Sequence, residues 1–226
     1  MQLRNFCGSI AVILGVVCLG HPAIAAGVNA NYNGHKSAIV GNTRRSSAES
    51  EVQIEGILSG VVDNLWERDD AYFLKGDYHN IINLARVIVE IDPGFIDCYA
   101  TGGWLMESLG DNHDAEAFYQ LAALRNPNVA DAYFYLGMFY FNTLHEYKPA
   151  VAIFTAGTKT GDADINDWKM LAHSLQHTGE YAKEVRIWKH IAHEWPNGLA
   201  VTINLERARK RLRDYGPNAS VAPKGR

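Results

Sequence analysis

The sequence predicts an all-α protein built as a solenoid of repeated helix–turn–helix units. From about residue 47 to residue 215 the apolar residues recur at helical spacing, and no stretch sustains the alternation of a half-buried strand. Pro93 and Pro127 lie 34 residues apart, and Pro196 follows 69 residues later, which is two such periods plus one inserted residue. Four mostly aromatic positions keep steps of 34, 34 and 35 residues: Leu65, Tyr99, Tyr133 and Trp168. A fixed period of this length indicates a repeat array whose units bury their apolar faces against one another.

The first 26 residues are typical of a secretory signal peptide. Arg4 is the only charged residue before an apolar run from Phe6 to Gly20, and Ala23-Ile24-Ala25-Ala26 supplies a small-x-small cleavage site. The run has 15 residues, fewer than the roughly 20 that a spanning helix needs, so cleavage is favoured over the alternative of a retained membrane anchor. We therefore expect an exported protein, periplasmic or extracellular, with no stable membrane span after cleavage.

The charge and cysteine content exclude several classes of protein. Without residues 1–26 the chain carries 20 basic and 25 acidic residues, because that segment holds one arginine and no acid. A net charge of −5 without a basic stripe argues against nucleic-acid binding, which draws most of its affinity from clustered Lys and Arg. The basic run from Arg207 to Arg213 is explained by the preference of cations for the carbonyl end of a helix. Signal cleavage leaves Cys98 as the single thiol, which excludes an intramolecular disulfide and predicts a packed helix residue.

The chain after the signal peptide divides into a leader, a flanking helix, four repeats, a capping helix and a tail. Residues 27–46 are rich in Gly, Asn and Ser and predict a flexible leader, and residues 47–61 predict a helix that flanks the first repeat. Four repeats follow at 62–95, 96–129, 130–164 and 165–198. Residues 199–215 predict a capping helix with a charged outer face, and residues 216–226 predict a disordered tail.

Small residues mark the turns and the close contacts of the repeats. Glycines that precede the second helix of a repeat predict turns with unusual backbone angles: Gly76, Gly110 and Gly179. Small residues within the first helices predict a close approach of the paired helices: Gly103, Gly137 and Ala172. The third repeat is one residue longer than the others, and the spacing places its extra residue in a turn between Tyr140 and Tyr147.

Several motifs within the repeats share one pattern. The most complete first half is Tyr133-x-x-Leu136-Gly137-x-x-Tyr140, and the most complete second half is Ala115-x-x-x-Tyr119 followed by Pro127. Partial copies are Ala150-x-x-x-Phe154 and Trp168-x-x-Leu171-Ala172. Together these motifs resemble the tetratricopeptide repeat (TPR) family, and the resemblance covers roughly residues 62–198. It implies a right-handed α-solenoid. The sequence departs from the family at Asp69, where a small residue is usual, and at Asp162, where neighbouring repeats have proline.

The resemblance also implies where a partner binds, namely on the first helix of each repeat, on the side away from its paired helix. The positions that match are Trp66 and Asp70 in the first repeat, Trp104 and Glu107 in the second, Phe134, Met138, Phe141 and Asn142 in the third, and Lys169, His173 and His177 in the fourth. Aromatic residues and methionine suit apolar anchors, while the fourth repeat offers polar and basic groups to an acidic end. The alternative is that several of these aromatics belong to the core or are covered by the flanking helix.

No motif in the sequence supports catalysis. We find no nucleophile elbow, phosphate loop, zinc-binding helix or dinucleotide-binding glycines, and predict no catalytic residue, no metal and no cofactor. His173 and His177 stand one helical turn apart, but the family resemblance places His190 and His193 on the opposite side, so the two pairs cannot share one ion. Residues 162–167 begin like a calcium loop and lack both its turn glycine and its closing glutamate.

These observations favour a non-enzymatic scaffold or adaptor that binds a protein or peptide in its concave groove. The alternative is a structural envelope protein that associates with copies of itself, in which case the chain forms a homo-oligomer.

Overall fold

The computed structural model describes residues 45–196 and 199–218. The predicted signal peptide, almost all of the leader and the end of the tail lie outside these residues. Within them the chain forms nine α-helices and one π-helical turn, and no strand, so the all-α prediction is confirmed. None of the helices in this part of the chain is long and apolar enough to cross a membrane.

The chain divides into two compact units, Met1–Leu84 and Ala85–Arg226, with the boundary inside helix α3 (Tyr78–Ile91). The first unit contains α2 (Arg45–Phe73) and the first half of α3. The predicted flanking helix at 47–61 and the first helix of the first repeat therefore form one continuous helix, in which no proline interrupts the backbone hydrogen bonds. The Phe73 and Tyr78 rings meet edge to face across the following turn, with centroids 5.8 Å apart.

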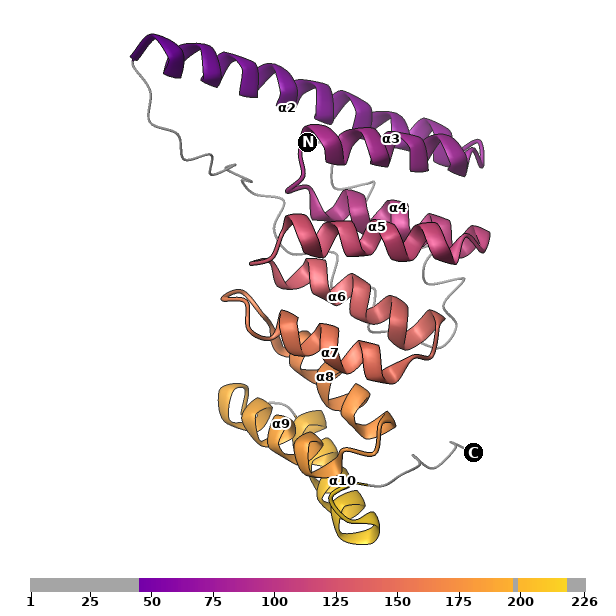
Figure 1. The fold of residues 1–226 in the computed structure, drawn as a ribbon, viewed down its shortest axis with the longest axis vertical. Helices are drawn as coiled ribbons and strands as arrows, with labels where there is room; N and C mark the ends of the chain where they lie inside the picture. Colours follow the sequence, from indigo (N-terminus) through magenta and orange to yellow (C-terminus); the bar gives the residue numbers. More distant parts are fainter. Residues whose placement is uncertain (1–44, 197–198, 219–226) are drawn as a thin grey trace. The chain divides into compact units, whose positions relative to one another are not determined.

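The second unit continues as a series of antiparallel helix pairs (Figure 1). The helices are α4 (Ile96–Leu109), α5 (Asn112–Arg125), α6 (Ala130–Met138), η1 (Phe139–Thr143), α7 (Tyr147–Gly157), α8 (Ile165–His177), α9 (Tyr181–Glu194) and α10 (Leu199–Tyr215). From α4 onward each helix packs against the next, and α4 also contacts α6, which contacts α8. The first helices of successive repeats thus lie in one row, as a solenoid of helix–turn–helix repeats requires.

The three predicted glycine turns share one backbone geometry. Gly76, Gly110 and Gly179 have φ values of +70°, +86° and +76°, a region that residues with a Cβ atom rarely adopt. At Gly110 the amide donates to the Glu107 carbonyl, and the Asp111 amide donates to the Met106 carbonyl. This pattern satisfies the last carbonyls of a helix and reverses the chain within a few residues. The same pair of hydrogen bonds recurs at the other two glycines.

The third repeat accommodates its extra residue in a different way. Its first helix ends in the π-helical turn Phe139–Thr143, and the Leu144 amide donates to the Phe139 carbonyl. His145 follows with φ +55°, the one positive value at a residue other than glycine in the described chain. The insertion predicted between Tyr140 and Tyr147 thus includes a wider helical turn as well as a loop. Such π turns arise where one residue is added to a helix.

Close packing inside each repeat depends on the small residues of the first helices. A Cβ atom on Gly137 would lie 2.6 Å from the Phe154 ring, and one on Gly103 would lie 2.4 Å from the Tyr119 ring. Real Cβ atoms do not approach other atoms so closely. The two glycines therefore admit the aromatic side chain of the paired helix, as the sequence predicted.

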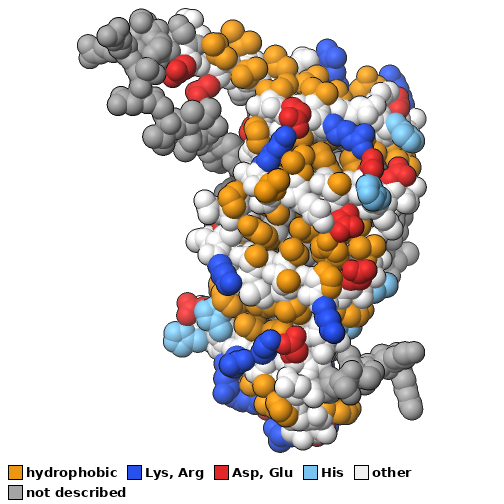
Figure 2. Space-filling model, in the orientation of Figure 1, with side chains coloured by type: hydrophobic (Ala, Val, Ile, Leu, Met, Phe, Trp, Pro, Cys, Tyr) orange, Lys and Arg blue, Asp and Glu red, His pale blue; other side chains and the backbone are white. Residues whose placement is uncertain are grey.

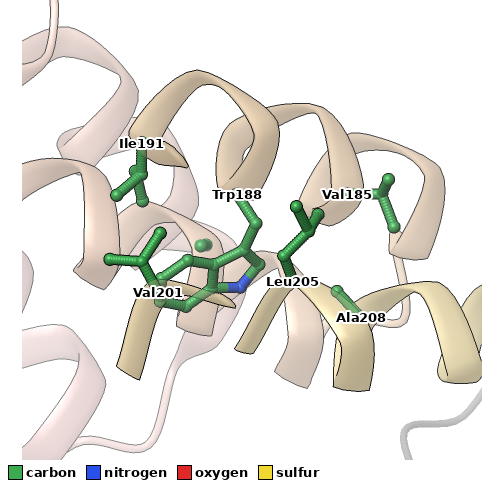
Figure 3. Close-up of a cluster of buried hydrophobic side chains, with 7 residues drawn as sticks. Val185, Trp188, Ile191, Val201, Leu205 and Ala208 are labelled. Atoms are coloured by element: carbon green, nitrogen blue, oxygen red, sulfur yellow. The ribbon is translucent and has the colours of Figure 1, made fainter. Parts of the chain in front are cut away.

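The predicted capping helix at 199–215 matches α10. Its buried face packs on α9 through two sets of apolar side chains: Val185, Trp188 and Ile191 on α9 with Val201, Leu205 and Ala208 on α10 (Figure 3). Arg211 on α10 also forms an ion pair with Glu184, which is fully buried on α9. The last helix is consequently joined to the array by both apolar packing and a charge pair.

Candidate functional site

The candidate site in the second unit is the exposed side of the row α4, α6–η1 and α8, which we call the first-helix surface. Trp104, Phe134, Met138 and Phe141 are all half-buried on this row. Phe134, Met138 and Phe141 pack on an apolar cluster that contains Phe154 and Leu171 among others. Phe134, Met138 and Phe141 thus contribute to the core while each stays partly open to solvent. The alternative that these aromatics belong to the core is therefore correct in part for Phe134 and Phe141.

The structure brings Phe141 and His177 together at the junction of the third and fourth repeats. Their rings meet edge to face with centroids 5.2 Å apart, and the His177 ring stacks on Tyr147 at 4.1 Å. Burial, and then the nearby His145, lower the pKa of His177 below 6.5. Tyr147 and His145 were absent from the predicted set, although both lie next to the inserted residue in the sequence.

Glu107 is held by hydrogen bonds within the chain. One carboxylate oxygen accepts a hydrogen bond of 2.6 Å from the Tyr119 hydroxyl, and the other accepts from the Thr143 hydroxyl. Burial raises the pKa of Glu107 above its ordinary value, while both hydrogen bonds oppose that rise. Both oxygens of this predicted ligand-binding residue are therefore already engaged with neighbouring helices. Asn142 precedes Thr143 in the π-helical turn Phe139–Thr143 and is half-buried.

The fourth repeat supplies the basic part of the surface. Lys169 is half-buried and forms no ion pair with a described residue. The His173 ring meets Trp188 edge to face at 5.5 Å. Burial lowers the pKa of His173, and the charges of His177, Arg211 and Lys169 lower it further. Burial thus favours the uncharged imidazole. Positive charge on this surface comes from Lys169, while Arg211 on α10 is paired with the buried Glu184.

Trp66 and Asp70 belong to the first unit. Trp66 is half-buried and Asp70 is exposed, one turn apart on α2. Between them in the sequence, Asp69 is 1% exposed, and neither of its carboxylate oxygens has a hydrogen-bond partner in the described part of the chain. Burial, followed by the charge of Asp70, raises the pKa of Asp69 to about 7. This is the position at which the sequence departs from the small residue of the family.

Comparison with known proteins gives matches at the level of structure. No protein-family model matches the sequence, and no characterised protein sequence does so. Two crystal structures of MamA match with TM-scores of 0.54 and 0.51, at 18% and 20% identity, over 69% and 64% of this chain and 85% of each MamA chain. A structure of PilF from Pseudomonas aeruginosa matches with a TM-score of 0.53 at 16% identity, over 71% of this chain and 72% of that chain.

This chain has the tetratricopeptide repeat fold. At such low identities the likeness concerns the fold alone. The TPR arrangement agrees with the 34-residue period, the glycine turns and the row of first helices described above.

The TPR fold also separates the histidines that the sequence placed in two pairs. The His190 ring packs against Trp168 at 4.1 Å and lies near Trp195, away from the contacts of His173 and His177. In residues 45–196 and 199–218 no group of three His, Cys, Asp or Glu side chains is arranged to hold a metal ion.

The acidic segment that begins like a calcium loop serves to cap two helices of the TPR array. The Asp164 side chain accepts hydrogen bonds from the Asn166 and Asp167 amides at the start of α8, and Asp167 accepts from the Asp164 amide. Asp162 accepts from the Ala130 amide at the start of α6. These carboxylates thus satisfy backbone donors that a helix start leaves without partners.

Proposed function

We propose that this chain is a non-enzymatic scaffold that binds a protein or peptide along the concave side of its TPR repeats. The observation that carries the proposal is the set of half-exposed aromatic side chains on contacting first helices, above all Trp104, Phe134 and Phe141. Rings of this kind bury a large area on binding and lose little side-chain entropy. The rigid helices beneath them hold the rings in place before a partner arrives, which reduces the entropic cost of binding.

The chemistry of the surface indicates the chemistry of the partner. Apolar side chains of a helical or extended segment would pack against the rings of the second and third repeats. An acidic group at one end of that segment would meet Lys169, whose ammonium group forms no ion pair with a described residue. His173 and His177 would contribute ring surface and neutral hydrogen bonds at pH 7, because burial lowers the pKa of each.

Capture of partners from the producing cell tests this proposal. The tagged full chain and a Trp104→Ala, Phe141→Ala variant are used as baits, and bound proteins are identified by mass spectrometry. The matched control is Val87→Ala with Leu124→Ala, which removes two exposed apolar side chains from the second helices α3 and α5. We expect a stoichiometric partner that the groove variant loses and the control keeps, with equal helicity by circular dichroism. Equal capture by all three baits would refute binding through this surface.

We further propose that the protein works outside the cytoplasm, in the periplasm or beyond. The support is the signal-like sequence of residues 1–26. Cell fractionation with sequencing of the N-terminus tests the proposal. A mature protein that begins near Ala26 or Gly27 in an exported fraction is the expected result, whereas an intact Met1 start in the cytoplasm would contradict it.

Self-association in an envelope structure is the second candidate function. It is favoured by the aliphatic side chains that α2 leaves exposed, which include Val52, Ile54 and Ile57. Soluble proteins rarely expose a run of such residues on one helix unless another molecule covers them.

A further inference from the structure

Helix α2 carries an exposed face that combines aliphatic and acidic side chains. Ile54 is 55% exposed and Leu58 is 41% exposed, and both share one helical face with Glu51 and Glu55. Val52, Ile57 and Val61 widen the apolar area, at 67%, 66% and 40% exposure. Figure 2 shows hydrophobic side chains along this helix. Leaving this much aliphatic surface in water is unfavourable, which points to a macromolecule that covers it.

The charged side chains of α2 between residues 51 and 67 are all acidic. Residues 51–67 contain four acidic residues and no lysine or arginine. Glu51 and Glu55 are exposed and form no ion pair with a described residue. A surface that fits this face therefore needs apolar contact together with positive charge.

Helix α10 presents such a surface. Its 17 residues contain five basic and two acidic side chains. Ile203, Arg207 and Lys210 share one exposed face, and Ile203 is 41% exposed. Asp214 lies on the same face and pairs with Lys210, while Arg207 and Arg213 form no ion pair with any described residue. Figure 2 shows Lys and Arg side chains gathered over α9 and α10.

We propose that α2 of one copy of this chain docks against α10 of a second copy. Ile54 and Leu58 pack beside Ile203, while Glu51 and Glu55 face Arg207 and Arg213. Because the two surfaces differ, the first copy keeps an unused α10 face and the second copy keeps an unused α2 face. Reciprocal docking of the two faces closes a two-fold dimer, and successive head-to-tail docking builds a ring or a chain of copies.

Charge favours this occupant over the other pairings of the same helices. Two α2 faces brought together would oppose Glu51 and Glu55 to identical residues, and two α10 faces would oppose Arg207 and Arg213 to themselves. Like charges that face each other at an interface disfavour binding, while opposite charges raise the association rate. Of the three ways in which α2 and α10 faces of two copies can pair, only α2 with α10 brings opposite charges together.

Charge reversal with rescue tests the proposal. One variant of the full chain carries Glu51→Lys and Glu55→Lys, and a second carries Arg207→Glu and Arg213→Glu. Light scattering and sedimentation over a concentration series should show that the wild-type mass rises with concentration and falls at high salt. Each reversed variant alone should bind itself at least about tenfold more weakly. An equimolar mixture of the two variants, or both reversals in one chain, should restore association.

Three results would overturn the proposal. These are a wild-type protein that stays monomeric at every concentration, an α10 reversal that associates as the wild type does, and a mixture that fails to recover association. The second result would assign the α2 face to pairing that does not involve α10. Circular dichroism confirms that the variants are folded, and all four substituted positions are exposed. The Trp104→Ala, Phe141→Ala variant should keep the wild-type mass, so failure of the groove proposal and failure of this one are separable.

Discussion

The Tyr119 hydroxyl donates a 2.6 Å hydrogen bond to Glu107, and this bond joins the two helices of the second repeat. The same carboxylate accepts a hydrogen bond from Thr143 at the end of the third repeat's first helix. Tyr119 is 3% exposed, and its burial together with the charge of Glu107 raises its pKa well above 10. One carboxylate thus connects α4, α5 and η1, and links two repeats through polar contacts as well as apolar ones.

Glu107→Ala should lower the free energy of unfolding by about 1–3 kcal/mol, because it leaves the buried Tyr119 hydroxyl without its acceptor. Tyr119→Phe should cost about 1 kcal/mol. Urea denaturation of both variants and of the double variant measures these losses. The double variant should lose less than the sum, since either substitution breaks the same hydrogen bond. Strictly additive losses would show that the two side chains act independently.

Gly137→Ala should destabilise the protein by about 1–3 kcal/mol, because the added Cβ atom collides with the buried Phe154 ring. Gly56→Ala is the matched control within a helix. Apart from the adjacent residues and the backbone of its own helix, nothing lies within 4 Å of the added Cβ there. Alanine is also the better helix former, so stability should rise by up to about 1 kcal/mol. Thermal unfolding followed by circular dichroism distinguishes the two directions. A Gly137→Ala protein as stable as the wild type would mean that the third repeat repacks freely.

Arg211→Met should lower the free energy of unfolding by about 3–5 kcal/mol, because it leaves the fully buried Glu184 without its positive partner. Arg209→Met removes an exposed pair with Glu206 on the same helix and should cost less than about 1 kcal/mol. Denaturant titration of both variants gives the comparison. Adding Glu184→Gln to Arg211→Met should recover part of the loss; no recovery would indicate that Arg211 acts through packing.

Asp69 should make the protein less stable as pH rises, which is opposite to the usual effect of a carboxylate that is stabilised by folding. Its pKa is about 7 in the folded chain against 3.8 as the ordinary value, so the folded state binds the extra proton between these two values. The free energy of unfolding therefore falls as pH rises from about 4 to about 7, by up to about 1.4 kcal/mol per pH unit from this group. Asp69→Ala should consequently stabilise the protein more at pH 8 than at pH 5.

Urea titrations of wild type and Asp69→Ala at several pH values measure that difference. Asp167 has a pKa raised to about 7 as well, but it is present in both proteins and cancels in the comparison. Glu67→Ala removes an exposed carboxylate on the same helix and serves as the control for the general effect of removing a charge. A difference between wild type and Asp69→Ala that stays constant from pH 4 to pH 8 would contradict the assignment.

The sequence alone determined the helical class, the repeat period, the glycine turns and the last helix. These features depend on local properties: apolar spacing at helical period, the φ freedom of glycine at Gly110, and the space that Gly137 leaves for Phe154. Each of them lies within one helix or one helix pair, so it can be deduced from the identity of nearby residues. The repeat spacing predicted a turn between Tyr140 and Tyr147, but it did not predict the π-helical turn Phe139–Thr143.

The tertiary structure decided which side chains of the candidate site are free and which are engaged. Glu107 meets Thr143 across 36 residues, Phe141 meets His177 across repeats, and Arg211 brings charge from the last helix beside His173. Such contacts depend on how far each helix is rotated and shifted relative to the helix it packs on. The spacing of residues in the sequence does not specify that rotation or shift. The sequence thus determined where a partner surface could form, and helix packing determined its chemistry.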